Sequence, residues 1–212
     1  AAVSIAELST KVIGLLLLPV FTAYLSPEEY GIISLTMLVF TCLNLLYNPG
    51  MLSAATRLYH ATEVHEERQE IIGSAFRFFV IVPLFVFIVS FFIGETICNF
   101  FFPNFEFYPY GILAIILALF TQVKRIWSAL MTLLYKVHIT AIYSVIAAVL
   151  SILTSILLVV VFNMGALGRV LGLLPSAIFL YIISLITINK FELSIFAFLK
   201  PKNEIPISLY RY

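Results

Sequence analysis

Charge is scarce in this 212-residue sequence, and the scarcity excludes most classes of soluble protein. Only 11% of the residues are charged, whereas 62% are hydrophobic, and the mean hydropathy is +1.10. Soluble proteins carry roughly 25% charged residues because a folded surface needs polar cover. The sequence therefore predicts an integral membrane protein, and not a cytosolic enzyme, a secreted disulfide scaffold or a disordered chain. The net charge of +1 gives no reason to expect a nucleic-acid partner.

Motifs for catalysis and cofactor binding are also missing. The sequence has no Gly-rich phosphate loop, no paired-histidine motif, no nucleophile elbow and no aspartate cluster. Cys42 and Cys98 have no histidine or acidic neighbour at metal-ligand spacing, and the charged segment 60–70 matches no ligand pattern. We therefore expect no cofactor, no metal and no enzymatic activity.

Long apolar runs predict an all-α membrane protein with six spanning helices. A helix needs about 20 mostly apolar residues to cross the hydrocarbon, and these runs are apolar on every face, unlike the strands of a membrane barrel. Polar segments separate the runs: 26–29 (Ser-Pro-Glu-Glu) is typical of a capping box, and 163–165 (Asn-Met-Gly) of a tight turn. The expected spans are 3–25, 30–56, 73–94, 108–135, 139–162 and 166–188, in one domain, with a cytoplasmic tail over 189–212.

Lysine and arginine are divided unequally between the two sets of loops. Only Arg169 falls on one side. The other side holds ten: Arg57, Arg68, Arg77, Lys124, Arg125, Lys136, Lys190, Lys200, Lys202 and Arg211. Because positively charged loops stay in the cytoplasm, both termini are predicted to be cytoplasmic.

Some ionisable residues fall within the predicted spans, where a charge is costly. At about 1.5 Å per residue, four cations share one level in the cytoplasmic half: Lys11, Arg77, Lys124 and Arg125. Either they form a partly buried cationic vestibule, or each extends its charge to the membrane interface. Glu7 is the only acid at this depth; it either couples transport to an ion or forms an i,i+4 pair with Lys11. Trp127, beside the cations, is predicted to anchor the helix at the interface.

Proline recurs inside the predicted spans. Each proline frees backbone groups and allows a bend, although prolines are common in membrane helices generally. They are interpreted either as packing features or as hinges. The candidate hinge residues are Pro19, Pro49, Gly50, Pro83 and Pro175.

Three segments carry a resemblance to a known family. Residues 17–31 read LLPVFTAYLSPEEYG, residues 49–59 read PGMLSAATRLY, and residues 165–172 read GALGRVLG. These segments resemble the Wzx-type polysaccharide flippases of the MOP superfamily, which also includes the MATE exporters and lipid II flippases. The element LSPEEYG at 25–31 is the most specific of the matches.

The resemblance implies a fold of two six-helix bundles around a central cavity, with roughly 12 to 14 spans in complete members. This chain would be the amino-terminal bundle. Its apolar start at Ala1 and the apolar approach to Tyr212 also predict a fragment cut at both ends.

The resemblance further implies a function in the bacterial inner membrane. Such a protein would move undecaprenyl-pyrophosphate-linked oligosaccharides, such as the O-antigen of lipopolysaccharide, to the outer leaflet. Its partners would be the lipid-linked glycan, membrane lipids and other polysaccharide-assembly proteins. The four cations would suit the pyrophosphate, and Glu7 would be the candidate for ion coupling.

Three other functions are weighed against the flippase. A MATE-like exporter of small cationic compounds would favour acids in the cavity, where this half has four cations and one acid. A membrane enzyme of glycan assembly would need a large periplasmic loop, and the longest expected outer loop is only 95–110. A non-transporting assembly factor is the third.

Overall fold

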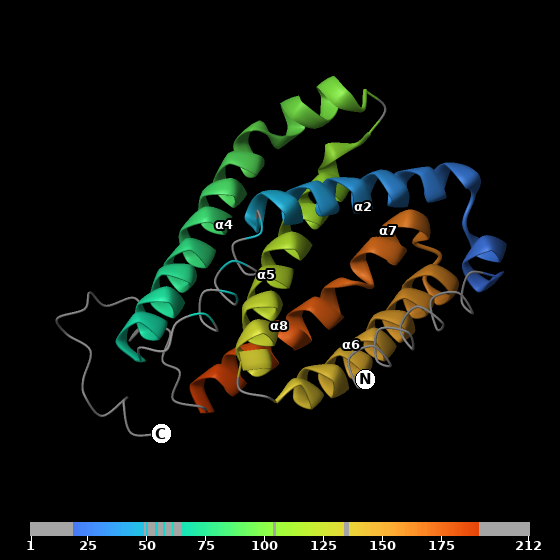
Figure 1. Ribbon diagram of the computed structural model, residues 1–212. Coiled ribbons are helices and arrows are strands. Elements are labelled where there is room, and N and C mark those ends of the chain that lie inside the picture. Colours follow the sequence, from blue (N-terminus) through green and yellow to red (C-terminus); the bar gives the residue numbers. More distant parts are fainter. Residues whose placement is uncertain are drawn as a thin grey trace.

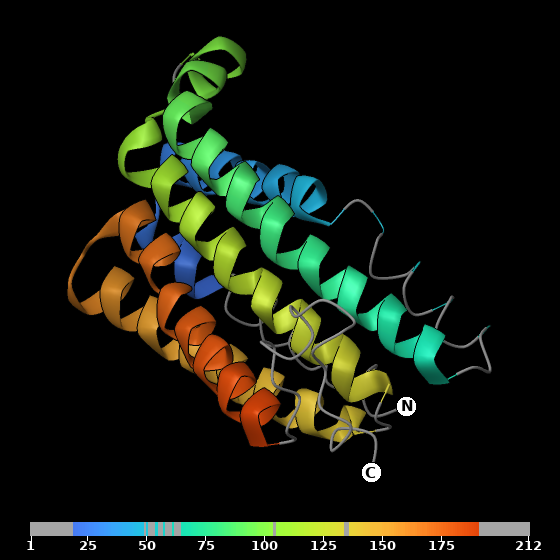
Figure 2. The same ribbon diagram turned by 90° about the vertical axis from the view of Figure 1, so that its left-hand side faces the viewer.

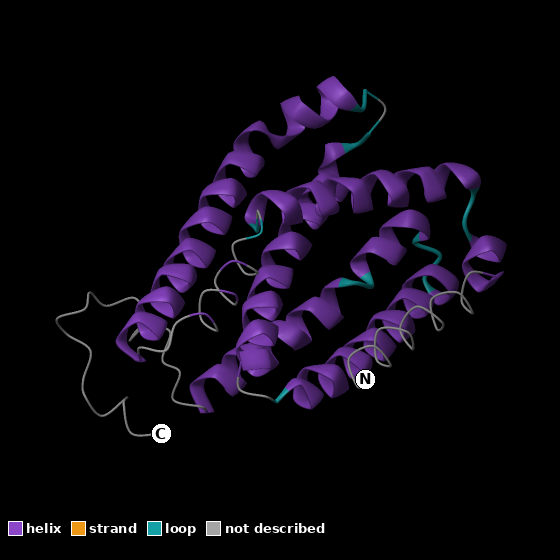
Figure 3. Cartoon of the chain, in the orientation of Figure 1, coloured by secondary structure: helices purple, strands orange, loops and turns teal. Residues whose placement is uncertain are grey.

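The computed structural model describes residues 19–48, 50, 54, 57, 61, 65–103, 105–133 and 136–190. Within these residues the regular structure is entirely helical (Figure 3). Among the described residues, five helical segments are long and apolar enough to cross a membrane: Pro27–Tyr47, Ile81–Phe101, Phe107–Thr132, Val137–Val161 and Gly165–Thr187. The prediction of an all-α, multi-pass membrane protein is confirmed.

The capping box expected before the second span is present. Helix α2 runs over Pro27–Tyr47, with the proline in its first turn. The Ser26 hydroxyl accepts a hydrogen bond from the Glu29 backbone N–H (3.3 Å), and the Glu29 carboxylate accepts one from the Ser26 backbone N–H (2.8 Å). Residues 19–24 are also helical, and only Leu25 and Ser26 separate them from α2.

Helix α4 (His65–Phe101) extends beyond both ends of the predicted span 73–94. Its apolar part is Ile81–Phe101, because a single acid, Glu95, is followed by further apolar residues and does not end the helix. The chain leaves the helix at Phe102. Pro83 lies inside α4 without ending it.

The next two spans each combine an α-helix with a π-helical turn. The fourth consists of η1 (Phe107–Gly111) and α5 (Ile112–Leu133). The fifth consists of α6 (Val137–Ile156) and η2 (Leu157–Val161). Both lie within a few residues of the predicted ranges.

The sixth span is interrupted. A tight turn precedes it, with φ of 52° at Asn163 and 54° at Gly165, as the turn residues indicated. Helix α7 (Gly165–Leu171) then ends, and α8 (Leu174–Lys190) begins after two residues in a turn. Pro175 therefore stands in the first turn of α8, where its missing N–H removes no helical hydrogen bond.

Helix α5 is the centre of the bundle. It packs against α2, α4, α6 and α8, and Figures 1 and 2 show α4, α5, α8 and α6 as a row of inclined helices with α2 laid across one side. One end of the bundle holds the starts of α2, η1 and α7 and the last turn of α4. It is called the Ser26 end. The opposite end, toward which α2 runs and where α6 begins and α8 finishes (Figure 2), is called the Asn48 end.

Two clusters of buried side chains hold α5 in place. One joins Leu43 and Tyr47 of α2 to Ala118 of α5. The other contains Trp127, Met131 and Leu180, between α5, α6 and α8. The predicted interfacial position of Trp127 is wrong: its side chain is 0% exposed, because the apolar ring packs between three helices instead of reaching the lipid headgroups.

Candidate functional site

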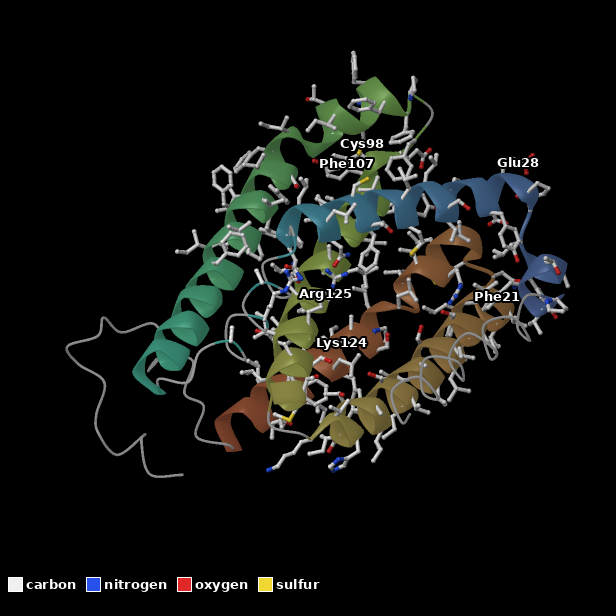
Figure 4. All side chains as sticks on the ribbon, viewed as in Figure 1. Phe21, Glu28, Cys98, Phe107, Lys124 and Arg125 are labelled. Carbon is white, nitrogen blue, oxygen red and sulfur yellow. The ribbon has the colours of Figure 1, made fainter. Side chains whose placement is uncertain are left out.

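Only part of the predicted site lies in the described residues. Glu7, Lys11 and Pro49 fall outside them, and Arg77 lies in α4 at a position whose side chain is not described. Lys124 and Arg125, both in α5, are described and partly buried (Figure 4). The predicted cationic group can therefore be located through these two residues.

Lys124 and Arg125 belong to different faces of α5. Consecutive residues of an α-helix project about 100° apart. Arg125 faces α2, since its Nη1 donates a hydrogen bond to the Asn44 carbonyl oxygen at 3.5 Å. Lys124 shares its face with Phe120, whose ring contacts that of Tyr181 in α8 at 5.2 Å. The two adjacent cations thus face different neighbouring helices.

Arg125 meets α2 at the end of that helix. The Asn44 carbonyl is one of the last four of α2, which have no partner within the helix. Helix α2 has no basic residue in its own last turn, so the Arg125 guanidinium supplies the positive charge that stabilises the negative end of the helix dipole. Asn44 is about 26 Å along α2 from Pro27, and Arg125 about 27 Å along the fourth span from Phe107.

Unpaired polar side chains surround this contact. The Gln122 amide, Asn44 Oδ1 and the Tyr47 hydroxyl are buried, and none of these atoms has a hydrogen-bond partner in the part of the chain that the structure describes. Gln122 precedes Arg125 by one turn on the same face of α5. A buried polar group without a partner costs about 1–3 kcal/mol, so this contact offers hydrogen-bonding capacity that water or a polar ligand can use.

Arg169 is a site residue that sequence reasoning missed. It was counted only as the single base of the outer loops, although it falls inside the predicted span 166–188. Its Nη1 donates a 2.7 Å hydrogen bond to Ser155 Oγ of α6, and its guanidinium lies 4.7 Å from the centre of the Phe21 ring. Its position four residues after the tight turn was the available signal.

A carboxylate ties two helix starts together at the Ser26 end. Besides accepting the hydrogen bond from Ser26, Glu29 accepts one from the Ala166 backbone N–H at 3.1 Å. Gly165 packs so closely against this carboxylate that a Cβ there would overlap it. The capping box predicted the first of these contacts but not the second, which joins residues 137 positions apart.

Comparison with known proteins assigns the chain to a family. A family model described as polysaccharide biosynthesis protein matches residues 1–210. Comparison with curated proteins and with solved structures gives no significant match. The family match spans nearly the whole chain and agrees with the row of apolar helices and the resemblance in the loops. The chain is thus a multi-pass membrane protein that belongs to the polysaccharide biosynthesis protein family.

Proposed function

We propose that this chain forms one bundle of a flippase that moves lipid-linked oligosaccharides across the bacterial inner membrane by alternating access. The family match supports a role in polysaccharide biosynthesis. The observation that carries the finer proposal is the position of Arg125, a cation inside the bundle, about 27 Å along its span and beside unpaired polar groups.

The chemistry of the substrate explains why such a cation is needed. A pyrophosphate cannot enter hydrocarbon without groups that replace its water. Arginine binds phosphate oxygens bidentately and keeps its charge when buried. Arg125 has five N–H donors, of which one is directed at the Asn44 carbonyl, so donors remain for a phosphate. Lys11 and Arg77 are also proposed for the cationic group, and Lys124 is proposed to contribute from the face of α5 that meets α8.

Orientation and coupling complete the proposal. The excess of Lys and Arg in one set of loops supports a cytoplasmic location for the Asn48 end, so Arg125 would meet the substrate in the leaflet where it is made. Glu7 is proposed to couple transport to an ion gradient, with a structural pair to Lys11 as the alternative. Pro19, Pro49, Gly50, Pro83 and Pro175 are the proposed hinge positions.

The proposal is tested by removing the cations. In cells that depend on the full-length protein, Arg125→Ala and Lys124→Ala should each reduce surface polysaccharide without lowering the protein level. Loss of a hydrogen-bonded charge costs about 1.5–3 kcal/mol, or roughly a 10-fold or greater loss of affinity. Arg125→Lys should retain part of the activity, because it keeps the charge but not the bidentate geometry.

The matched control is Arg57→Ala, which removes an exposed cation outside the proposed cationic group. It should leave the polysaccharide unchanged. Normal polysaccharide in both Arg125→Ala and Lys124→Ala would mean that these cations only extend to the membrane interface, and the proposed site would be abandoned.

A further inference from the structure

Arg169 carries a charge that no acid in the described part of the chain neutralises. Its partners are neutral: the Ser155 hydroxyl and the Phe21 ring. Glu29, which precedes Tyr30 at the same end of the bundle, is bonded instead to the backbone N–H groups of Ser26 and Ala166. A cation inside a membrane protein without a counter-charge is expensive. The arrangement therefore favours an anion from outside the chain.

A second group at this place also lacks a partner. The Tyr30 hydroxyl is buried and has no hydrogen-bond partner among the described residues. Tyr30 packs on the same cluster as Phe21 and Val159, and the Phe21 ring in turn contacts the Arg169 guanidinium. A guanidinium with unused N–H groups and a free hydroxyl donor together match an anion that has several acceptor oxygens.

We propose that Arg169 and Tyr30, with Ser155 holding the guanidinium in place, form a second anion site that binds the phosphate group of a lipid. Arg169 lies about 6 Å along α7 from Gly165, whereas Arg125 lies about 27 Å from the same end of the bundle. The two sites are therefore about 20 Å apart along the bundle. This inference rests on the proposed function. Given that function, the Arg169 site is where the diphosphate of the glycan lipid is held before release, because it lies at the opposite end of the bundle from the entry side.

The ligand has two possible sources with the same chemistry. One is the diphosphate of the transported lipid, and the other is the phosphate of an ordinary anionic phospholipid in the outer leaflet. Both present negatively charged oxygens at the depth of a lipid headgroup. The test therefore uses undecaprenyl pyrophosphate and phosphatidylglycerol as separate probes.

Binding of undecaprenyl pyrophosphate is measured on the full-length protein in phosphatidylcholine nanodiscs. Tyr30→Phe should weaken binding about 10-fold, because a hydrogen bond to a charged group is lost. Its melting temperature should not fall, because the hydroxyl has no hydrogen-bond partner among the described residues. Arg169→Gln should weaken binding further, and Arg169→Lys should recover part of the loss.

The control and the background variant separate this inference from the proposed function. Tyr24→Phe removes a hydroxyl from an exposed side chain near the same end and should change nothing. Each variant is repeated with Arg125→Gln, where the remaining binding comes from the Arg169 site and should still be sensitive to Tyr30→Phe. If Arg125→Gln leaves the binding of undecaprenyl pyrophosphate unchanged while Tyr30→Phe and Arg169→Gln weaken it, the proposed function fails and the Arg169 site stands.

The second probe identifies the source. Competition by phosphatidylglycerol in wild type but not in Arg169→Gln would show that phospholipid headgroups also occupy the site. Lack of competition, with undecaprenyl pyrophosphate binding still dependent on Tyr30, would assign the site to the transported lipid. Wild-type binding of both probes by Tyr30→Phe and Arg169→Gln would overturn the inference.

Discussion

The residue scale shows why a charge in a membrane segment has to be interpreted through its neighbours. Arg125 and Arg169 both interrupt apolar sequence, and the sequence alone offers only depth along the helix for Arg125 and the division of charge between loops for Arg169. The structure gives Arg125 a helix end to stabilise and Arg169 a hydroxyl and an aromatic ring. Those partners are 81 and 14 positions away in the sequence, so no local pattern could predict them.

Two glycines offer a matched test of the joint between α2 and α7. Gly165 has a φ of 54° and packs against the Glu29 carboxylate, whereas nothing lies within 4 Å of a Cβ at Gly31. Gly165→Ala should lower the free energy of unfolding by about 1–2 kcal/mol from backbone strain alone. Gly31→Ala, within α2, should raise it by about 0.5–1 kcal/mol.

Unfolding of both variants can be followed by circular dichroism in a detergent titration. A Gly165→Ala protein as stable as wild type would mean that the Glu29–Ala166 contact does not constrain the turn. A Gly31→Ala protein destabilised as strongly as Gly165→Ala would show that the method does not resolve the two environments.

At the scale of elements, the sequence predicted where helices start better than where they end or are interrupted. The capping box and the turn at 163–165 have specific chemistry, and both helix starts lie where expected. The charge at Glu95 predicts the start of a loop, whereas α4 continues to Phe101. The interruption between α7 and α8 comes just before Pro175, a predicted hinge position, because a proline ring clashes with the carbonyl four residues earlier in a continuous helix. At the same place Gly172 packs so closely against Ser155 of α6 that a Cβ would overlap it, a contact that the sequence does not indicate.

Pro83 tests whether helix α4 contains a hinge. Proline in a helix interior removes a hydrogen bond and costs about 3 kcal/mol, so Pro83→Ala should raise the melting temperature. If the residue is a hinge, transport should fall despite the greater stability. The measurement is the rate of lipid translocation at equal protein level, and an unchanged rate would assign Pro83 to packing alone.

At the scale of the whole molecule, the membrane-spanning bundle is the feature that the sequence predicted best. The composition was enough to predict a bundle of membrane helices. A chain with so few charged residues cannot cover its apolar side chains in water, so its surface has to face lipid. Exposed rings on α4, such as Phe92 and Phe100, are 76% and 80% exposed, and lipid is their natural surroundings. The internal packing of Trp127 was not predictable, since an aromatic ring suits both an interface and a core.

Orientation can be measured with cysteines at exposed positions. With Cys42 and Cys98 replaced by serine, Glu106→Cys should react with an impermeant maleimide only from outside the cell, and His138→Cys only from the cytoplasm. Both side chains are exposed, at opposite ends of the bundle. The bias of Lys and Arg toward one set of loops is the reason. The reverse labelling pattern would invert the protein and place Arg169, not Arg125, at the cytoplasmic side.

Translocation by the purified full-length protein tests the central claim most directly. Proteoliposomes are loaded with a fluorescent undecaprenyl-pyrophosphate oligosaccharide, and the fraction that becomes accessible to an external quencher is followed over time. The account predicts that this fraction rises faster than in protein-free vesicles and that Arg125→Ala slows the rise about 10-fold or more. A rate equal to that of protein-free vesicles, or an Arg125→Ala rate equal to wild type, would contradict it.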